Sequence, residues 1–158
     1  NGRILRHTMV NECFSRTLRS ASLPNIQEPQ NLHYSNNIRP DGITLIPFAR
    51  GKALAWDVSC PHPLAQSHIE NNKSTGQLST ITEKRKTAKY SSLQPQFIFK
   101  GVIIDTIGAY GEQTESLIQN IGQRLILKTG STQAASNFRQ RLSLAIQKGN
   151  KLTVYFNL

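Results

Sequence analysis

GITLIPFARGKALAWDVSC, residues 42–60, contains two apolar runs joined by a short turn. The runs cover residues 42–46 and 53–60, and the segment between them includes Pro47 and Gly51, which favour a change of chain direction. The stretch therefore predicts a β-hairpin at the centre of a sheet.

The residues on the N-terminal side of this hairpin predict a helix, a short strand and a loop. Apolar side chains at helical spacing, from Leu5 to Leu18, indicate an amphipathic helix that ends before Pro24. Residues 26–28 lie between Pro24 and Pro29 and predict an edge strand. Residues 31–37 are polar and rich in turn-forming residues, which predicts a loop.

The residues after the hairpin predict further helices and strands. Residues 61–80 are mostly polar, which indicates a loop with one short helix near residues 64–69. A basic segment without Gly or Pro predicts a helix over residues 83–93, and an apolar run predicts a buried strand over residues 97–104. Apolar residues then repeat at helical spacing before Gly130 and before Gly149, which predicts two closing helices, and residues 152–156 predict a last strand.

The order of these elements predicts one α/β domain over residues 1–158, with a mixed sheet flanked by helices. No apolar run approaches the roughly 18 to 20 residues that a membrane span needs, so we expect a soluble protein without a membrane partner. The chain starts at Asn1 rather than Met and has no signal-peptide pattern, so we expect it to be part of a longer protein.

The charge of the chain points to polyanionic partners. Lys and Arg total 19 against 9 acidic residues, a net charge of +10, which attracts nucleic acid. Charge alone is equally compatible with an ordinary basic protein. Cys13 and Cys60 have no zinc-type or disulfide-type spacing and indicate reduced thiols of an intracellular protein.

Aspartate is scarce, and its distribution suggests a metal site. The chain contains Asp41, Asp57 and Asp105, and the first two belong to the predicted hairpin. A carboxylate beside Trp56 in a buried strand needs a partner, unless that strand turns Asp57 toward solvent. Two carboxylates from adjacent strands can hold Mg²⁺ or Mn²⁺, and a lysine nearby can stabilise charge that develops on a phosphate.

Three short motifs occur in the order of a known nuclease family: RPDG at residues 39–42, WDVS at 56–59 and RKTAKY at 85–90. Together they resemble the restriction-like, PD-(D/E)xK-type endonuclease domain at the C-terminus of non-LTR retrotransposon reverse transcriptases. The segments RHT at residues 6–8 and IGQR at 121–124 are similar to an opening Arg-His-Asn motif and a later Gly-Arg helix of that family. The resemblance covers nearly the whole chain.

This resemblance implies a restriction-endonuclease-like αβββαβ core followed by two C-terminal helices. Asp41 and Asp57 would be catalytic metal ligands, with the carbonyl of Val58 as a further ligand. Ser59 stands where the common pattern has lysine, and similar domains supply that lysine from the following helix, so Lys86 is the first choice and Lys89 the second. A third acid would be Glu12 or Glu28, between which the sequence does not decide.

The candidate contacts to nucleic acid come from two parts of the chain. They are Arg6, His7, Arg39, Lys84, Arg85 and Tyr90. For the basic helix the alternative is a solvated face, and Tyr90 would either support the lysines or touch DNA.

The resemblance implies a Mg²⁺-dependent nuclear endonuclease that nicks DNA so that the released 3′ hydroxyl primes reverse transcription. An upstream reverse transcriptase domain and retroelement RNA are the expected partners. One alternative is an inactive DNA-binding remnant, which Thr8 in place of the family's Asn favours. Another is a basic accessory domain that binds RNA or protein.

Overall fold

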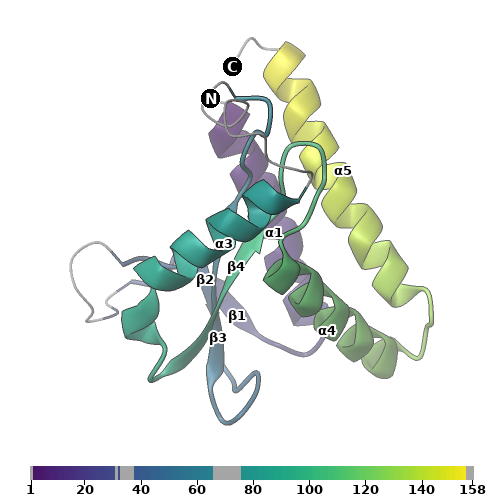
Figure 1. Cartoon of the computed structure of the whole chain (residues 1–158). Helices are drawn as coiled ribbons and strands as arrows, with labels where there is room; N and C mark the ends of the chain where they lie inside the picture. The colour runs from purple at the N-terminus through teal and green to yellow at the C-terminus, as the bar shows by residue number, and fades with distance from the viewer. Residues whose placement is uncertain (1, 31, 33–37, 66–75, 156–158) are drawn as a thin grey trace.

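Four strands form one mixed sheet in the order β1-β2-β3-β4 within the residues that the computed structural model describes, 2–30, 32, 38–65 and 76–155 (Figure 1). The strands are β1 (Asn25–Gln27), β2 (Gly42–Thr44), β3 (Ala53–Ser59) and β4 (Phe97–Ile103). β1 pairs antiparallel with β2, and β2 pairs antiparallel with β3. β3 runs parallel to β4, with Asp57 opposite Gly101.

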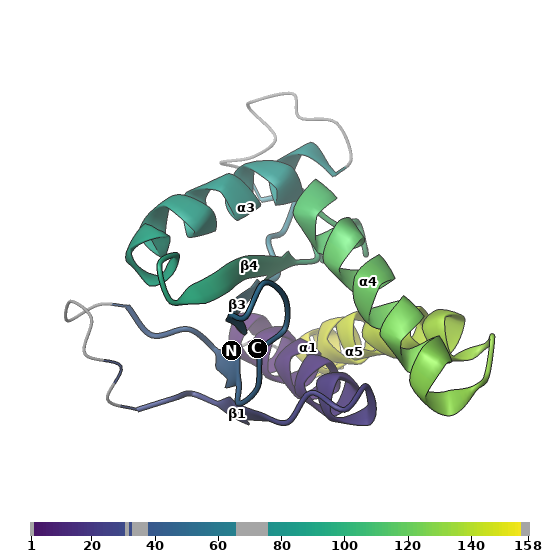
Figure 2. The same cartoon turned by 90° about the horizontal axis from the view of Figure 1, so that it is seen from below.

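Helices cover both faces of this sheet, which makes the fold α/β as predicted. The long helices are α1 (Gly2–Ser20), α3 (Gln77–Lys89), α4 (Glu112–Thr129) and α5 (Ala134–Tyr155), and a short 3-10 helix, η1 (Ser91–Leu93), follows α3. Figure 2 shows α3 on one side of the sheet and α1 with α5 on the other. Within the described residues no helix is both long and apolar enough to cross a membrane.

The central strand β3 is buried on both faces because its alternate side chains enter two different cores. Leu54, Trp56 and Val58 belong to the larger core, which α1, α4 and α5 cover. Ala55 belongs to the smaller core beneath α3 and η1. Asp57 therefore points to the α3 side of the sheet, since successive side chains of a strand alternate.

Trp56 anchors the sheet to α1. Its ring is fully buried and meets Phe14 edge to face at a centroid distance of 5.2 Å, and its indole N–H donates to Asn11 Oδ1 at 2.8 Å. Gly42 lies opposite Trp56 on β2, where any Cβ would overlap the indole ring. A glycine is thus required at the start of β2.

Several predicted boundaries need correction. The predicted last strand over residues 152–156 is wrong as far as Tyr155, because α5 continues to that residue and Gly149 lies inside the helix. Gly149 packs directly against Arg6 of α1, and Thr153 packs against Gly2, so contact with α1 overrides the β preference of this segment. One long helix, α5, thus replaces the predicted helix and the predicted strand that was to follow it.

The region between β3 and α3 also differs from the prediction. α3 begins at Gln77, so the predicted loop ends earlier than residue 80 and the predicted helix starts later than the real one. Leu64 lies in a turn, and residues 66–69 of the predicted short helix lie outside the described residues. The prediction for residues 31–37 also falls mostly outside them.

Candidate active site

Asp57 is a buried carboxylate on the α3 side of β3, with 5% of its surface exposed. Its Oδ2 forms an ion pair with Lys86 Nζ at 2.6 Å. Its Oδ1 accepts a hydrogen bond from the Tyr90 hydroxyl at 3.1 Å. Lys86 and Tyr90 lie one helical turn apart at the end of α3, so the helix brings both groups to the same carboxylate.

Tyr90 connects Asp57 to the segment that precedes β2. Its ring is 2% exposed and stacks on Phe99 at a centroid distance of 4.5 Å. Its hydroxyl also lies 3.0 Å from the Arg39 carbonyl oxygen. A phenol has one proton, so Tyr90 donates to Arg39 or to Asp57 but not to both at once.

Asp41 immediately precedes β2 and is held by backbone and side-chain partners. Its N–H donates to the Trp56 carbonyl at 2.8 Å. Its Oδ2 accepts the Val58 N–H at 2.6 Å and lies 2.8 Å from His7 Nε2 of α1. Asp41 is therefore fixed beside Asp57 at the boundary between β2 and β3.

The two carboxyl groups have pKa values shifted in opposite directions. Burial raises the pKa of Asp57, the negative charge of Asp41 raises it further, and Lys86 opposes the change. Burial also acts to raise the pKa of Asp41, but the hydrogen bonds from His7 and from the Val58 N–H outweigh it and leave that pKa below its ordinary value. Asp41 therefore keeps its charge to lower pH than Asp57 does.

The neighbouring groups respond to this negative charge. The hydrogen bond to Asp41 raises the pKa of His7 above its ordinary value, although burial opposes it. Burial raises the pKa of Tyr90 well above its ordinary value, and the charge of Asp57 adds to the effect. His7 thus binds a proton more readily beside Asp41, and Tyr90 stays protonated at neutral pH.

The structure distinguishes between the two candidate lysines, Lys86 and Lys89, and between the two candidate third acids, Glu12 and Glu28. Lys89 is exposed and its Nζ lies 5.3 Å from the centre of the Tyr90 ring, so Lys86 is the lysine at Asp57. Glu12 is exposed on α1 at the edge of a hollow between α1 and α5, and its carboxylate is 4.0 Å from Arg16. Glu28 is exposed, and its N–H donates to the Asp41 carbonyl at 2.9 Å.

Within the described residues no third acid joins Asp41 and Asp57 in a metal-binding group. Across the described residues, no group of three or more His, Cys, Asp or Glu side chains is arranged to hold a metal ion. Glu28 is the nearer of the two predicted third acids because it lines a small pocket together with Asp41 and Arg39.

Some of the candidate contacts to nucleic acid are exposed, and the others are already bonded or buried within the chain. Arg39, Lys84 and Arg85 are exposed. Arg6 is half-buried, with Nη1 within 3.5 Å of Asn150 Oδ1 and 3.4 Å of Thr153 Oγ1 on α5. His7 is bonded to Asp41, and the buried ring of Tyr90 is covered, so the geometry assigns Tyr90 to support of the acid rather than to stacking on a base.

Two further buried acids, which the motifs do not mark, have structural roles. Glu83 accepts the N–H groups of Gln113 and Thr114 at 3.0 and 2.7 Å at the start of α4. Asp105 accepts the N–H groups of Ile107 and Ala109 at 2.9 and 2.8 Å in its own turn. Asp57 differs from both because its partners, Lys86 and Tyr90, are side chains rather than backbone N–H groups.

The bond between His7 and Asp41 is a feature of the site that residue spacing missed. Histidine spacing along the chain contains no ligand pattern, and the two residues are 34 positions apart. The opening RHT segment was the available indication, through its likeness to the family's Arg-His-Asn motif.

No protein-family model matches the chain, and no curated protein sequence matches it at a significant level.

Proposed function

We propose that this chain is a restriction-like, metal-dependent endonuclease domain that cuts one strand of DNA. The observation that carries the proposal is the buried carboxylate of Asp57, paired with Lys86 and adjacent to Asp41 at the ends of neighbouring strands. Two acids can hold the metal ion and a lysine beside them can stabilise developing charge, which are two contributions to metal-assisted phosphodiester hydrolysis. In a longer retroelement protein, such a nick would prime an upstream reverse transcriptase on its RNA in the nucleus.

The oxygen atoms at this site suit a hard divalent cation. Asp57 Oδ2 is buried, and within the described residues its contact with the Lys86 ammonium at 2.6 Å is the one that meets its charge. The Val58 N–H points to Asp41, and the carbonyl of a strand residue points to the same side as its N–H. Asp41, Asp57 and the Val58 carbonyl would thus hold Mg²⁺ or Mn²⁺.

The residues of the chain would divide the chemistry among them. A bound cation would polarise the scissile phosphodiester and lower the pKa of an attacking water. The Lys86 ammonium lies beside Asp57. It can turn to a phosphate oxygen and stabilise the negative charge that develops there. Tyr90 orients Asp57, and His7 together with the Val58 N–H fixes Asp41.

Nicking of supercoiled plasmid tests this proposal. Mg²⁺ should support nicking and EDTA should stop it. Asp57→Asn should abolish nicking while leaving the fold and most DNA binding intact, and Lys86→Ala should slow nicking by a similar or smaller factor. Lys84→Ala is the matched control, because it removes an exposed lysine from the same helix and should mainly weaken binding.

Cleavage by Asp57→Asn equal to that of the parent would reject this site. If the parent does not cleave, the assay is repeated with the chain joined to an upstream reverse transcriptase domain of the kind that the proposal implies, since such segments can be needed to present DNA. Continued inactivity with those segments would reject the nuclease.

An inactive DNA-binding remnant is the second candidate function. It is favoured by the partners that already occupy both acids, His7 on Asp41 and Lys86 on Asp57, and by the absence of a three-residue metal cluster in the described residues. A remnant would bind DNA with the exposed residues Arg39, Lys84 and Arg85 and would not nick it under any metal condition.

A further inference from the structure

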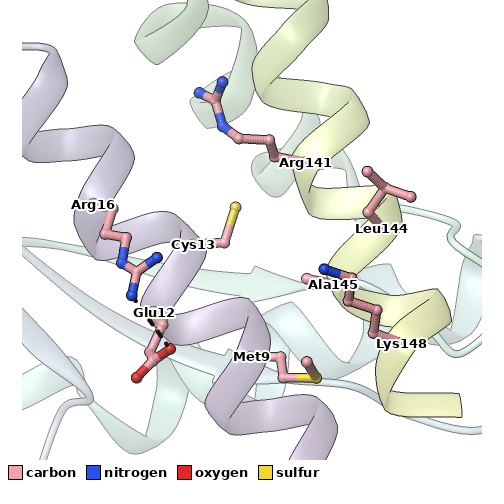
Figure 3. Close-up of a pocket in the computed structure, with 8 residues that line it drawn as sticks. All are labelled: Met9, Glu12, Cys13, Arg16, Arg141, Leu144, Ala145 and Lys148. Atoms are coloured by element: carbon pink, nitrogen blue, oxygen red, sulfur yellow. Dashed lines mark ion pairs between the residues drawn. The ribbon is translucent and has the colours of Figure 1, made fainter. Parts of the chain in front are cut away.

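A groove runs between α1 and α5 on the side of α1 that faces away from the sheet. Asn11 and Phe14 of α1 face β3, where both contact Trp56. Met9 and Cys13 point instead toward α5 and line one wall of a hollow of about 270 Å³ (Figure 3). This groove is separate from the residues of the candidate active site.

The floor of the groove is apolar and partly open to solvent. Met9 and Cys13 come from α1 and Ala145 comes from α5, whereas Leu144 lines the hollow from its outer edge on α5 (Figure 3). Leu144 is 45% exposed although it is a large aliphatic side chain. Such a floor provides no hydrogen-bonding groups for a phosphate backbone or a base edge, but it favours apolar side chains of a ligand.

The rim of the groove is positively charged. Arg141 and Lys148 come from α5 and Arg16 from α1, whereas Glu12 is the one acid that lines the hollow. The dashed line in Figure 3 joins Glu12 to Arg16, whose charged atoms are 4.0 Å apart. The charges of Glu12 and Arg16 offset each other, so Arg141 and Lys148 remain as uncompensated rim charges.

A second hollow lies along α5 from the one in Figure 3 and shares Arg141 with it. This hollow, of about 280 Å³, lies near the turn between α4 and α5 and is also lined by Asn137 and Ala134. From Ala134 to Lys148 the helix rises about 20 Å, at 1.5 Å per residue. Two hollows spaced along one helix suit the side chains of a helical or extended segment better than one small molecule.

We propose that this groove binds an acidic amphipathic segment of a partner protein, with apolar residues on its floor and carboxylates against Arg141 and Lys148. The mode is that of an amphipathic helix in an apolar groove. Duplex DNA would meet the rim charges but would leave the apolar floor exposed to water. A membrane surface would not enter a concave groove between two helices. This inference concerns a different site and partner from the proposed nuclease.

A fluorescein-labelled helical peptide of about four turns, with Leu on one face and Glu on the other, is the probe. Anisotropy should show saturable binding to the parent chain. A peptide with Gln in place of every Glu, and one with Ser in place of every Leu, should each bind at least about tenfold more weakly. If the Leu-to-Ser peptide binds as well as the probe, the surface attracts charge alone and the proposal fails.

Variants of the protein locate the binding. Arg141→Glu and Leu144→Ser both change exposed side chains of the groove and should each weaken binding at least about tenfold. Lys128→Glu makes the same charge change as Arg141→Glu at an exposed position of α4 outside both hollows, and should leave binding nearly unchanged. An equal loss in Arg141→Glu and Lys128→Glu would overturn the proposal.

Cys13 reports on the groove directly. The chain has two cysteines, so Cys60→Ala leaves Cys13 as its one thiol. Bound probe should slow the reaction of Cys13 with a thiol reagent severalfold, and the Gln peptide at the same concentration should not. Binding that leaves the Cys13 reaction rate unchanged, or no binding of the probe to the parent, would overturn the proposal.

Discussion

At the scale of single residues, the buried acids of this chain separate into two kinds. Glu83 and Asp105 accept backbone N–H groups that are fixed by the fold. Asp57 is paired instead with two side chains, the partly exposed Lys86 and the buried Tyr90. Lys86 can leave Asp57 without breaking a backbone hydrogen bond, so this carboxylate can exchange its ion pair for a ligand, whereas the N–H groups on Glu83 and Asp105 belong to a helix start and a turn.

The pair formed by His7 and Asp41 predicts a pH-dependent stability. The pKa of His7 is raised above its ordinary 6.5, so the stabilisation from its proton is fully present below pH 6.5 and is lost as the pH rises through the raised value. Urea unfolding in EDTA should therefore show a larger loss of stability for His7→Gln at about pH 5.5 than at about pH 9.

His62→Gln is the control for this experiment. His62 is exposed and its Nδ1 is bonded to the Thr106 hydroxyl rather than to an acid. The substitution removes an exposed imidazole without an acidic partner, so its effect on the free energy of unfolding should be small. If the loss of unfolding free energy in His7→Gln is the same at both pH values, the pair of His7 and Asp41 contributes no stability that depends on a bound proton.

At the scale of elements, the order and class of the helices and strands could be predicted because hydrophobic periodicity changes with each one. The site was partly predictable for the same reason: a strand places Asp57 and the following helix places Lys86. The end of α5 could not be predicted, since Val154 and Tyr155 favour a strand locally and the contacts of Gly149 and Thr153 with α1 decide otherwise.

The contact of α1 with the candidate site also could not be predicted from the local sequence pattern. His7 reaches Asp41 because α1 packs on the face of the sheet opposite α3, where Phe14 and Asn11 contact Trp56. Neither Glu12 nor Glu28 carries a sequence feature that says which lies nearer to Asp41. The separation depends on the exposed face of α1 that carries Glu12, and on the bond from the Glu28 N–H to the Asp41 carbonyl.

The start of α4 depends on a single residue of α3. Glu83 is 1% exposed and accepts the first N–H groups of α4, and Gly111 leaves space for its carboxylate. Glu83→Ala should cost about 3 kcal/mol of stability, because it leaves buried N–H groups without acceptors. Denaturant unfolding of the variant and the parent measures this difference.

Glu112→Ala is the matched control on the same helix end. Glu112 is exposed in the first turn of α4, so its removal should change stability by no more than about 0.5 kcal/mol. Equal losses in the two variants would mean that Glu83 acts as a general charge near the helix and not as its cap.

At the scale of the whole molecule, a net charge of +10 predicts DNA binding that depends steeply on salt. Each phosphate neutralised contributes a slope of about −0.9 to the logarithm of affinity against the logarithm of salt. Anisotropy of labelled duplex DNA should show this slope with little dependence on sequence. Lys84→Ala should reduce the slope by about one, and Lys128→Ala, at the distant end of α4, should leave it unchanged. A flat response would argue for a protein or RNA partner instead.

The central claim is that Asp41 and Asp57 together form a site for a divalent cation. Titration calorimetry with Mn²⁺ tests it without DNA and without turnover. The account predicts one Mn²⁺ bound per parent chain, loss of that binding in Asp57→Asn and in Asp41→Asn, and unchanged binding in Glu12→Gln, whose side chain lies at the edge of the hollow between α1 and α5. Binding of Mn²⁺ by Asp57→Asn with the affinity of the parent, or no binding by the parent, would contradict it.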